Sequence, residues 1–170
     1  MLLRGPSAVG KTAVAKSLLL YIKDELKKDC AYVCEDDFRK QMQYKYKAED
    51  KIAHTNSVQL ITALIRTLQK IDTYDYYVIE GLFRYEDMIN HYKAFCKENK
   101  LDLHIFQLTA SLEIRKERNK RSAIRDHVVD FEKKHSKGDG EEIPVKGSII
   151  IDASQPIENA VKEIVSYIKY

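Results

Sequence analysis

The sequence predicts an α/β fold in which a five-stranded parallel β-sheet is covered by helices on both faces, giving three layers. The chain has 170 residues, the length of one ordinary domain, so we expect a single domain over residues 1–170. Short apolar runs alternate along it with longer segments of helical periodicity. Parallel neighbours need crossover connections of about a dozen residues or more, usually helices, so this alternation favours a parallel sheet.

Five apolar runs predict the strands. They are Met1–Arg4, Cys30–Cys34, Tyr76–Ile79, Leu101–Leu108 and Ser148–Asp152. A continuous apolar run such as Tyr76–Ile79 is typical of a strand that is buried on both faces.

Five further segments predict the helices. They are Thr12–Lys28, Glu49–Ile71, Tyr85–Lys100, Ser111 to about His135, and a last helix that Pro156 opens. The first carries apolar residues four apart, the stripe of an amphipathic helix, at Val14, Leu18, Ile22 and Leu26. Pro156 suits the first turn of a helix, because the N–H that proline lacks would have no helical partner there.

Composition and charge exclude several classes of protein. Lysine and arginine number 29 against 26 aspartate and glutamate, so the net charge is +3, too small to favour non-specific binding to nucleic acid or membranes. No apolar run approaches the roughly 18 residues that span a bilayer, and no secretory leader is recognisable. We therefore expect a cytoplasmic protein with no membrane association and no stable nucleic-acid complex. Cys30, Cys34 and Cys96 lack the spacing of metal ligands and are expected to be free, buried thiols.

The strongest motif is the segment Gly5–Thr12, which we call the phosphate loop. It reads Gly-Pro-Ser-Ala-Val-Gly-Lys-Thr and fits G-x-x-x-x-G-K-[ST] at every required position. The two glycines let backbone N–H groups turn inward around an anion, and the helix that follows adds its unpaired donors. Lys11 can reach the outer phosphates and Thr12 can offer its hydroxyl to Mg²⁺. The predicted nucleotide contacts in the loop are Gly5, Ser7, Ala8, Val9, Gly10, Lys11 and Thr12. The alternative is a glycine turn before a helix, with the lysine facing water.

Acidic residues follow two of the predicted strands. Glu35-Asp36-Asp37-Phe38-Arg39 comes after the second strand, and Glu80 ends the third. Ligands of open parallel sheets bind beyond the carboxyl ends of the strands, where these residues and the phosphate loop emerge together. Asp36 could accept a hydrogen bond from a substrate hydroxyl, Arg39 could grip an anionic group, and Glu80 could support Mg²⁺ or substrate. The alternatives are a helix start with Asp36 or Asp37 as the cap, and an acid that merely marks the end of a strand.

Four arginines share one face of the helix predicted from Ser111. They stand at offsets of three, six and ten residues and are Arg115, Arg118, Arg121 and Arg125. Such a face could close over ATP and neutralise the charge of a transferred phosphoryl group. The alternative is a solvated basic face that forms weak ion pairs with neighbouring acids.

With these parts in place, the chain resembles the small P-loop kinases that phosphorylate hydroxyls. This superfamily includes polynucleotide-kinase-like, zeta-toxin-like, chloramphenicol-phosphotransferase-like, adenylylsulfate-kinase and uridine-kinase-like enzymes. Asp36-Asp37-Phe38-Arg39 looks like the D-D-[FY]-R segment of polynucleotide-kinase-type enzymes, which implies that Asp36 is the base and Arg39 binds the acceptor. Glu80-Gly81 is more similar to the E-G of uridine-kinase-like proteins, so the two motifs point to different substrates.

The resemblance also implies features that the residues alone do not. It implies the sheet order 2-3-1-4-5, a helical lid over about residues 110–137, and Arg118 and Arg121 as the lid arginines that contact ATP. It further implies that the segment beginning at Asp152 flanks the adenine.

The predicted function is an ATP- and Mg²⁺-dependent kinase that moves the γ-phosphoryl group to a hydroxyl of a small molecule, nucleoside or nucleotide. The predicted catalytic residues are Lys11, Asp36, Arg118 and Arg121; substrate binding falls to Asp36, Arg39 and Glu80, metal binding to Thr12 and Glu80, and further nucleotide contacts to Arg118 and Asp152. The alternative is a nucleotide-binding switch or an assembly ATPase that uses the same loop without a small-molecule acceptor.

Overall fold

The computed structural model describes residues 1–41, 51–71, 74–121 and 144–168. Within them, five parallel strands form one sheet in the order β2-β3-β1-β4-β5, which confirms the predicted α/β class and strand order. The strands are β1 (Leu2–Arg4), β2 (Cys30–Cys34), β3 (Tyr76–Gly81), β4 (Ile105–Thr109) and β5 (Ile149–Asp152).

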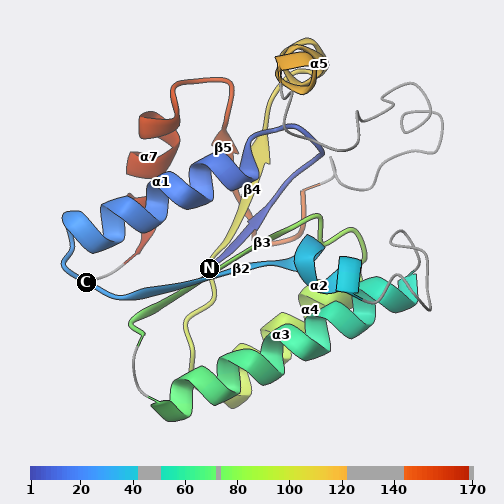
Figure 1. Cartoon of the computed structure of the whole chain (residues 1–170), viewed down its shortest axis with the longest axis vertical. Coiled ribbons are helices and arrows are strands. Elements are labelled where there is room, and N and C mark those ends of the chain that lie inside the picture. Colours follow the sequence, from blue (N-terminus) through green and yellow to red (C-terminus); the bar gives the residue numbers. More distant parts are fainter. Residues whose placement is uncertain (42–50, 72–73, 122–143, 169–170) are drawn as a thin grey trace.

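Helices cover both faces of the sheet, so the fold has three layers (Figure 1). They are α1 (Lys11–Asp24), α2 (Glu35–Gln41), α3 (Lys51–Ile71), α4 (Glu86–Glu98), α5 (Leu112–Arg121) and α7 (Ile157–Tyr167). The helices α1 and α7 lie on one face, and α3 and α4 lie on the other. Among the described helices, none is both long and apolar enough to cross a membrane.

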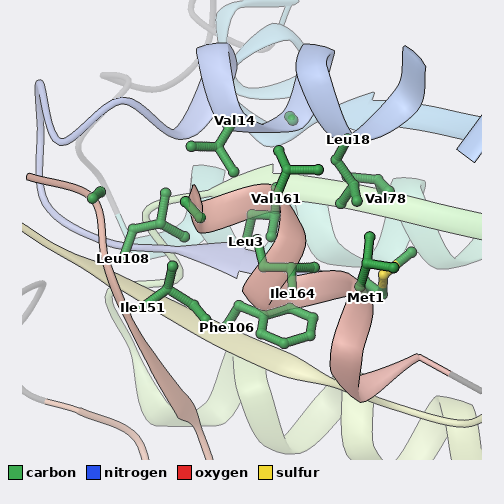
Figure 2. Packing of buried hydrophobic residues seen from close by; sticks show 14 of the residues in the cluster. Met1, Leu3, Val14, Leu18, Val78, Phe106, Leu108, Ile151, Val161 and Ile164 are labelled. Carbon is green, nitrogen blue, oxygen red and sulfur yellow. The ribbon is translucent and has the colours of Figure 1, made fainter. Parts of the chain in front are cut away.

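Each face of the sheet has its own hydrophobic core, because successive side chains of a strand point to opposite faces. In β1, Leu3 packs with α1 and α7, as Figure 2 shows, whereas Leu2 packs with α3 and α4. Both leucines are fully buried, and burial of such a side chain stabilises the fold by about 1.5–3 kcal/mol. Val14, Leu18 and Ile22 of the predicted apolar stripe are likewise buried in the first core.

Most predicted boundaries lie within two residues of the observed ones, but one end of the first helix and one of the fourth strand are wrong by four residues. The first helix ends at Asp24 instead of Lys28, and Lys27 then adopts a φ of +54°, which a helix does not permit. The strand β4 begins at Ile105 instead of Leu101, because the Leu101 N–H bonds to the Cys96 carbonyl in the turn that ends α4.

The register brings the ends of three strands together. Glu80 in β3 lies opposite Cys34 of β2 and Leu3 of β1, so the residues that follow these strands emerge at one edge of the sheet. The predicted lid is described only as far as Arg121 of α5, and Arg125 lies outside the described residues. The three cysteines are free thiols, as predicted, but they are half-buried rather than buried.

Candidate active site

The phosphate loop follows β1 directly and has an unusual backbone. Gly5 and Gly10 have φ values of +153° and +108°, and Ala8 adopts a φ of +62°. At Gly5, a Cβ atom would lie 2.6 Å from the carbonyl oxygen of Leu108, so no other residue fits. Left-handed backbone at Ala8 costs about 1–2 kcal/mol. Strain of this kind persists where the surrounding structure enforces it, which occurs most often at ligand-binding sites.

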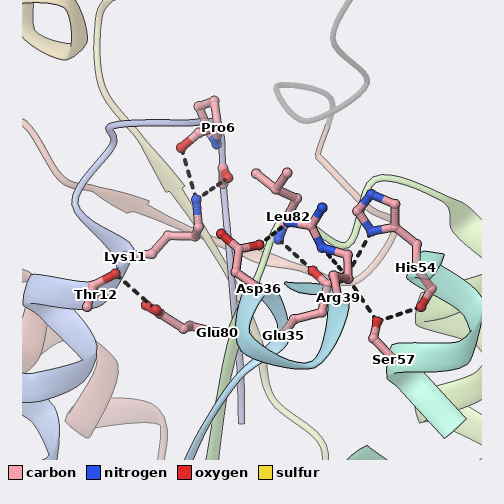
Figure 3. Close-up of polar contacts among 11 residues, drawn as sticks. Pro6, Lys11, Thr12, Glu35, Asp36, Arg39, His54, Ser57, Glu80 and Leu82 are labelled. Carbon is pink, nitrogen blue, oxygen red and sulfur yellow. Dashed lines mark hydrogen bonds and ion pairs between the residues drawn. The ribbon is translucent and has the colours of Figure 1, made fainter. Parts of the chain in front are cut away.

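Lys11 lies across the mouth of this loop. Its Nζ donates hydrogen bonds to the carbonyl oxygens of Gly5 at 2.9 Å and Pro6 at 3.1 Å (Figure 3). The ammonium group is therefore held against the start of the phosphate loop, where its positive charge favours an anion. Its position is held by the backbone of the loop itself.

Thr12 and Glu80 meet beside the loop. The Thr12 hydroxyl donates to Glu80 Oε1 at 2.9 Å, and the Tyr32 hydroxyl donates to the same oxygen at 2.7 Å. Glu80 is only 3% exposed, and its Oε2 is buried with no hydrogen-bond partner in the part of the chain that the structure describes. A buried carboxylate oxygen left without a partner is costly, so this oxygen is suited to a cationic ligand.

Oxygen ligands of this kind fit Mg²⁺. No group of three or more His, Cys, Asp and Glu that could hold a metal ion occurs at this site or elsewhere among residues 1–41, 51–71, 74–121 and 144–168. Mg²⁺ at phosphate sites needs only one or two protein oxygens, since water and the phosphates complete its coordination. The structure therefore brings together Thr12 and Glu80, the two residues of the predicted metal site, whose metal binding stays a prediction. No sequence motif pointed to the contact of Tyr32 with Glu80.

The Glu80 carboxylate also influences its neighbours. Burial, with the nearby Glu80 charge, raises the pKa of Tyr32 well above its usual range, so its hydroxyl stays a hydrogen-bond donor. The same two causes raise the pKa of the Cys34 thiol to about 12. Both groups are therefore neutral at physiological pH, so neither adds a negative charge beside the Glu80 carboxylate.

Asp36 lies near Lys11, with its carboxylate toward the phosphate loop (Figure 3). The helix α2 begins at Glu35, immediately after β2, so Asp36 and Asp37 stand in its first turn. The Asp36 side chain is 47% exposed and accepts a hydrogen bond from Arg39. Partial burial opposes ionisation of Asp36, but the charges of Arg39 and Lys11 outweigh it and lower its pKa. Asp36 is therefore a carboxylate at neutral pH, whereas Asp37 points outward as an exposed residue.

Arg39 lies behind Asp36 and is only 7% exposed. One edge of its guanidinium contacts Asp36, and its Nε lies 3.2 Å from Glu35 Oε1. Its charge is thus shared between two carboxylates of its own helix. Glu35 is fully buried, and no sequence motif pointed to a role for it.

The described arginines of α5 do not share one environment. Arg118 donates to the carbonyl oxygens of Val9 and Ala153, each at 2.7 Å, and so joins the phosphate loop to the turn after β5. Arg115 is buried, while Arg121 is exposed and paired with Glu117 of its own helix. The structure brings Arg118 to the phosphate loop but does not bring Arg121 there, and the catalytic role of both stays a prediction.

A cavity of about 290 Å³ opens beside the phosphate loop. It is lined by Ala8, Val9, Gly10, Ala13, Val14, Arg118, Ala153, Gln155, Ile157 and Ala160. Asp152 does not line it. Its carboxylate accepts hydrogen bonds from the Ser154 N–H and hydroxyl, and the hydroxyl lowers its pKa. The predicted flanking segment therefore contributes Ala153 and Gln155, while Asp152 shapes the turn.

A larger cavity, of about 530 Å³, lies at the opposite edge of the sheet. Its lining includes Met1, Tyr76 and His104, which stand at the amino ends of three strands. Open parallel sheets bind their ligands at the carboxyl ends of the strands. The strained loop, the lysine and the acids all lie at that carboxyl edge, so we place the site there.

Comparison with known proteins identifies the fold. No protein-family model and no curated protein matches the chain. Among solved structures, the crystal structure of APE1195 is 20% identical with a TM-score of 0.71, and the alignment covers 97% of this chain and 91% of that one. A gluconokinase from Sinorhizobium meliloti 1021 is 13% identical with a TM-score of 0.65, covering 97% and 88%.

A third similar structure was solved with a nucleotide. It is the Mycobacterium tuberculosis APS kinase CysC in complex with AMPPNP and APS, at 12% identity and a TM-score of 0.70, covering 97% of this chain and 94% of that one. The chain therefore has the fold of the small P-loop kinases, and the resemblance drawn from the motifs is confirmed at that level. At these identities the likeness establishes the fold, whereas the reaction has to be argued from the site.

Proposed function

We propose that the protein is an ATP- and Mg²⁺-dependent phosphotransferase that moves the γ-phosphoryl group of ATP to a hydroxyl of a small molecule, nucleoside or nucleotide. The observation that carries this proposal is the juxtaposition of Lys11 in the phosphate loop with the Asp36 carboxylate, close enough for each charge to influence the other. A loop that binds phosphate needs no such carboxylate, whereas transfer to a hydroxyl requires a group that orients the acceptor.

The nucleotide would bind along the phosphate loop and α1. Inward N–H groups and Lys11 would hold the phosphates, and the adjoining cavity between Val9 and Ala153 has room for the base. Arg118 already contacts both walls of this cavity, which supports its predicted place beside the nucleotide.

Thr12 and Glu80 would hold the metal, with Tyr32 fixing one Glu80 oxygen. When bound, Mg²⁺ supplies positive charge against the phosphates during transfer. The role of Tyr32 is to orient the carboxylate, since it donates to Oε1 and leaves Oε2 to the ligand.

Asp36 would accept a hydrogen bond from the acceptor hydroxyl and hold its oxygen in line with the γ-phosphoryl group. Its lowered pKa makes it a weak base. This suits phosphoryl transfer, whose transition state is loose, so that positioning and charge neutralisation matter more than base strength. Arg39 stands beside Asp36, and the predicted lid arginines Arg118 and Arg121 would neutralise charge on the phosphoryl group.

Two measurements test the proposal in sequence. Calorimetry with MgATP asks whether the site binds the nucleotide, with Lys11→Ala as the control that should lose affinity. A screen with radiolabelled γ-phosphate then offers nucleosides, oligonucleotide 5′ ends, APS, sugars including gluconate, and chloramphenicol- or aminoglycoside-like alcohols. Binding with transfer to one acceptor class supports the kinase. Binding without transfer to any class favours the switch or assembly ATPase, and an absence of binding contradicts both.

A further inference from the structure

A fully buried carboxylate lies directly behind Asp36. The Glu35 side chain has no exposed surface. Its Oε1 is 2.8 Å from His54 Nδ1, accepts from the Ser57 hydroxyl at 3.2 Å and lies 3.2 Å from Arg39 Nε. Its Oε2 accepts from the Leu82 N–H at 3.2 Å. One carboxylate therefore joins α2, α3 and the segment that follows β3.

The chain also leaves space for this carboxylate at one particular position. A Cβ atom on residue 81 would lie 2.6 Å from Glu35 Oε2 and 2.8 Å from Glu35 Cβ, so only glycine fits there. Gly81 follows Glu80 in the sequence, and Glu35 precedes Asp36. The two motifs that pointed to different families therefore meet in space, because Glu35 packs against the glycine of one and immediately precedes the other in the chain.

Burial of a charged group is unfavourable unless its partners compensate. An apolar residue in place of a buried, paired charge is often at least as stable, so stability alone does not explain Glu35. The partners of Glu35 indicate what else it does. Arg39 contacts Glu35 through Nε and Asp36 through Nη2. Because a guanidinium is planar and rigid, contacts on two of its edges fix its plane. The orientation of the Asp36 carboxylate is therefore tied to the buried Glu35.

His54 completes the arrangement from α3. Its ring is buried, packs edge-on against Tyr85 with centroids 5.5 Å apart, and points Nδ1 at Glu35. Since a carboxylate only accepts hydrogen bonds, Nδ1 must carry a proton. Its Nε2 is buried without a hydrogen-bond partner among the described residues. Among the described residues, the His54 ring therefore makes its side-chain hydrogen bond to Glu35, through Nδ1 alone.

We propose that Glu35 and His54 are positioning residues for phosphoryl transfer. Neither touches the reacting atoms: His54 holds the Glu35 carboxylate, Glu35 holds the Arg39 guanidinium, and Arg39 holds Asp36 in the orientation that meets the acceptor hydroxyl. This inference rests on the proposed function, in which Asp36 orients that hydroxyl. It adds two buried residues, from two elements, that determine the rate without contacting substrate.

Substitution of His54 separates positioning from packing. Asparagine places an amide N–H near the position of Nδ1, whereas leucine fills the apolar volume and offers no donor. We expect His54→Leu to lower kcat about 10- to 100-fold, as small misplacements of catalytic groups do, and His54→Asn to stay within about threefold of wild type. The apparent affinity for MgATP should stay within about twofold in both variants. Packing alone would predict the reverse order, because leucine suits a buried site better than asparagine.

Glu35→Gln is the second test, since it keeps the size of the side chain and removes its charge. We expect kcat to fall about 10- to 100-fold with the MgATP affinity unchanged. Thr62→Val is the matched control on α3: among the described residues, this buried hydroxyl donates only to the Val58 and Gln59 carbonyls of its own helix and makes one long contact to His91. It should change the unfolding midpoint and leave kcat at the wild-type value.

The outcomes distinguish this inference from the proposed function. If the acceptor screen finds no substrate, the rate of MgATP hydrolysis, in which water takes the place of the hydroxyl, is compared across the same variants. The order wild type, His54→Asn, then His54→Leu in either reaction supports positioning. Equal rates in all variants, equal losses from asparagine and leucine, or a parallel loss of MgATP affinity overturn the positioning role and leave the kinase intact. A wild-type protein that turns over no ATP in either reaction overturns both.

Discussion

The phosphate loop is built from eight consecutive residues, whereas the acceptor side, which we define as Asp36 with Glu35, Arg39 and His54, is assembled from two helices. In the loop, the backbone conformation determines the geometry of the site. Gly5, Ala8 and Gly10 have positive φ values, and Lys11 donates hydrogen bonds to loop carbonyls. On the acceptor side, buried side chains hold one another through ion pairs and hydrogen bonds.

This difference has a physical consequence for each half. Backbone geometry is local, so the loop keeps its shape as long as β1 and α1 are in place. The acceptor side depends on a charged residue in the interior, whose partners must all be present because an unpaired buried charge is strongly unfavourable. We therefore expect the phosphate loop to tolerate distant substitutions and the acceptor side to be sensitive to them.

The largest effect should come from the phosphate side. Lys11→Ala removes the cation that is held against the Gly5 and Pro6 carbonyls of the loop, and we expect kcat to fall about 1,000-fold, since the lost group acts on charge that develops during transfer. Asp37→Ala, at an exposed position of α2, should stay within about threefold. Steady-state kinetics of both purified variants, with circular dichroism to confirm folding, measures the contrast. Comparable losses in the two folded proteins would contradict the assignment of Lys11.

Glu80 stands where the two halves meet. Glu80→Gln removes the charge but keeps the shape that receives the Thr12 and Tyr32 hydroxyls. We expect the Mg²⁺ concentration for half-maximal activity to rise about 10- to 100-fold, which is the usual scale for a group that supports a metal. Tyr32→Phe, which removes only one donor to Oε1, should shift it less. A Mg²⁺ titration that is unchanged in Glu80→Gln would remove Glu80 from the metal site.

The sequence predicts well the features that depend on neighbouring residues, and it predicts poorly the contacts between residues far apart in the chain. The strands and the phosphate loop follow from patterns within short windows, whereas the order of the strands follows from the resemblance to the small P-loop kinases. The acid run after β2 gave no sign that its first residue is buried, because the partners of Glu35 in α3 and after β3 are 19 and 47 residues away. No spacing rule connects such positions.

The prediction that the arginines of α5 act together on ATP is limited for a related reason. Helical periodicity places Arg115 and Arg118 on one face, but it does not say what that face meets. The structure buries Arg115 and sets Arg118 against Val9 and Ala153, which belong to different turns of the chain. The environment of each side chain is decided by tertiary packing, and the sequence pattern could predict only their common direction.

Two glycine substitutions separate backbone from side-chain control. Gly81→Ala drives a Cβ against Glu35, so we expect a loss of about 1–3 kcal/mol in unfolding free energy and a fall in kcat of about tenfold, with MgATP affinity retained. At Gly10 a Cβ would meet only Arg118 Nη1 at 3.6 Å, but the φ of +108° disfavours alanine. Gly10→Ala should therefore weaken MgATP binding instead. Urea unfolding and calorimetry on both variants measure the contrast, and identical profiles would contradict it.

The smallest effect concerns acid stability on the acceptor side. The pKa of Asp36 lies below its ordinary value of 3.8 because Arg39 and Lys11 outweigh the opposing effect of burial. A lowered pKa means that ionised Asp36 favours the folded state above pH 3.8, and this contribution disappears as the pH falls below that value through the folded-state pKa. Asp36→Asn should therefore be less stable than wild type at pH 6, by a modest amount since the side chain is half-exposed, and the difference should shrink toward pH 3. Urea midpoints at intervals between these values test this, with Thr62→Val as a non-titrating control whose difference from wild type stays constant. A difference for Asp36→Asn that is equally constant would mean that Arg39 and Lys11 do not hold this carboxylate in solution.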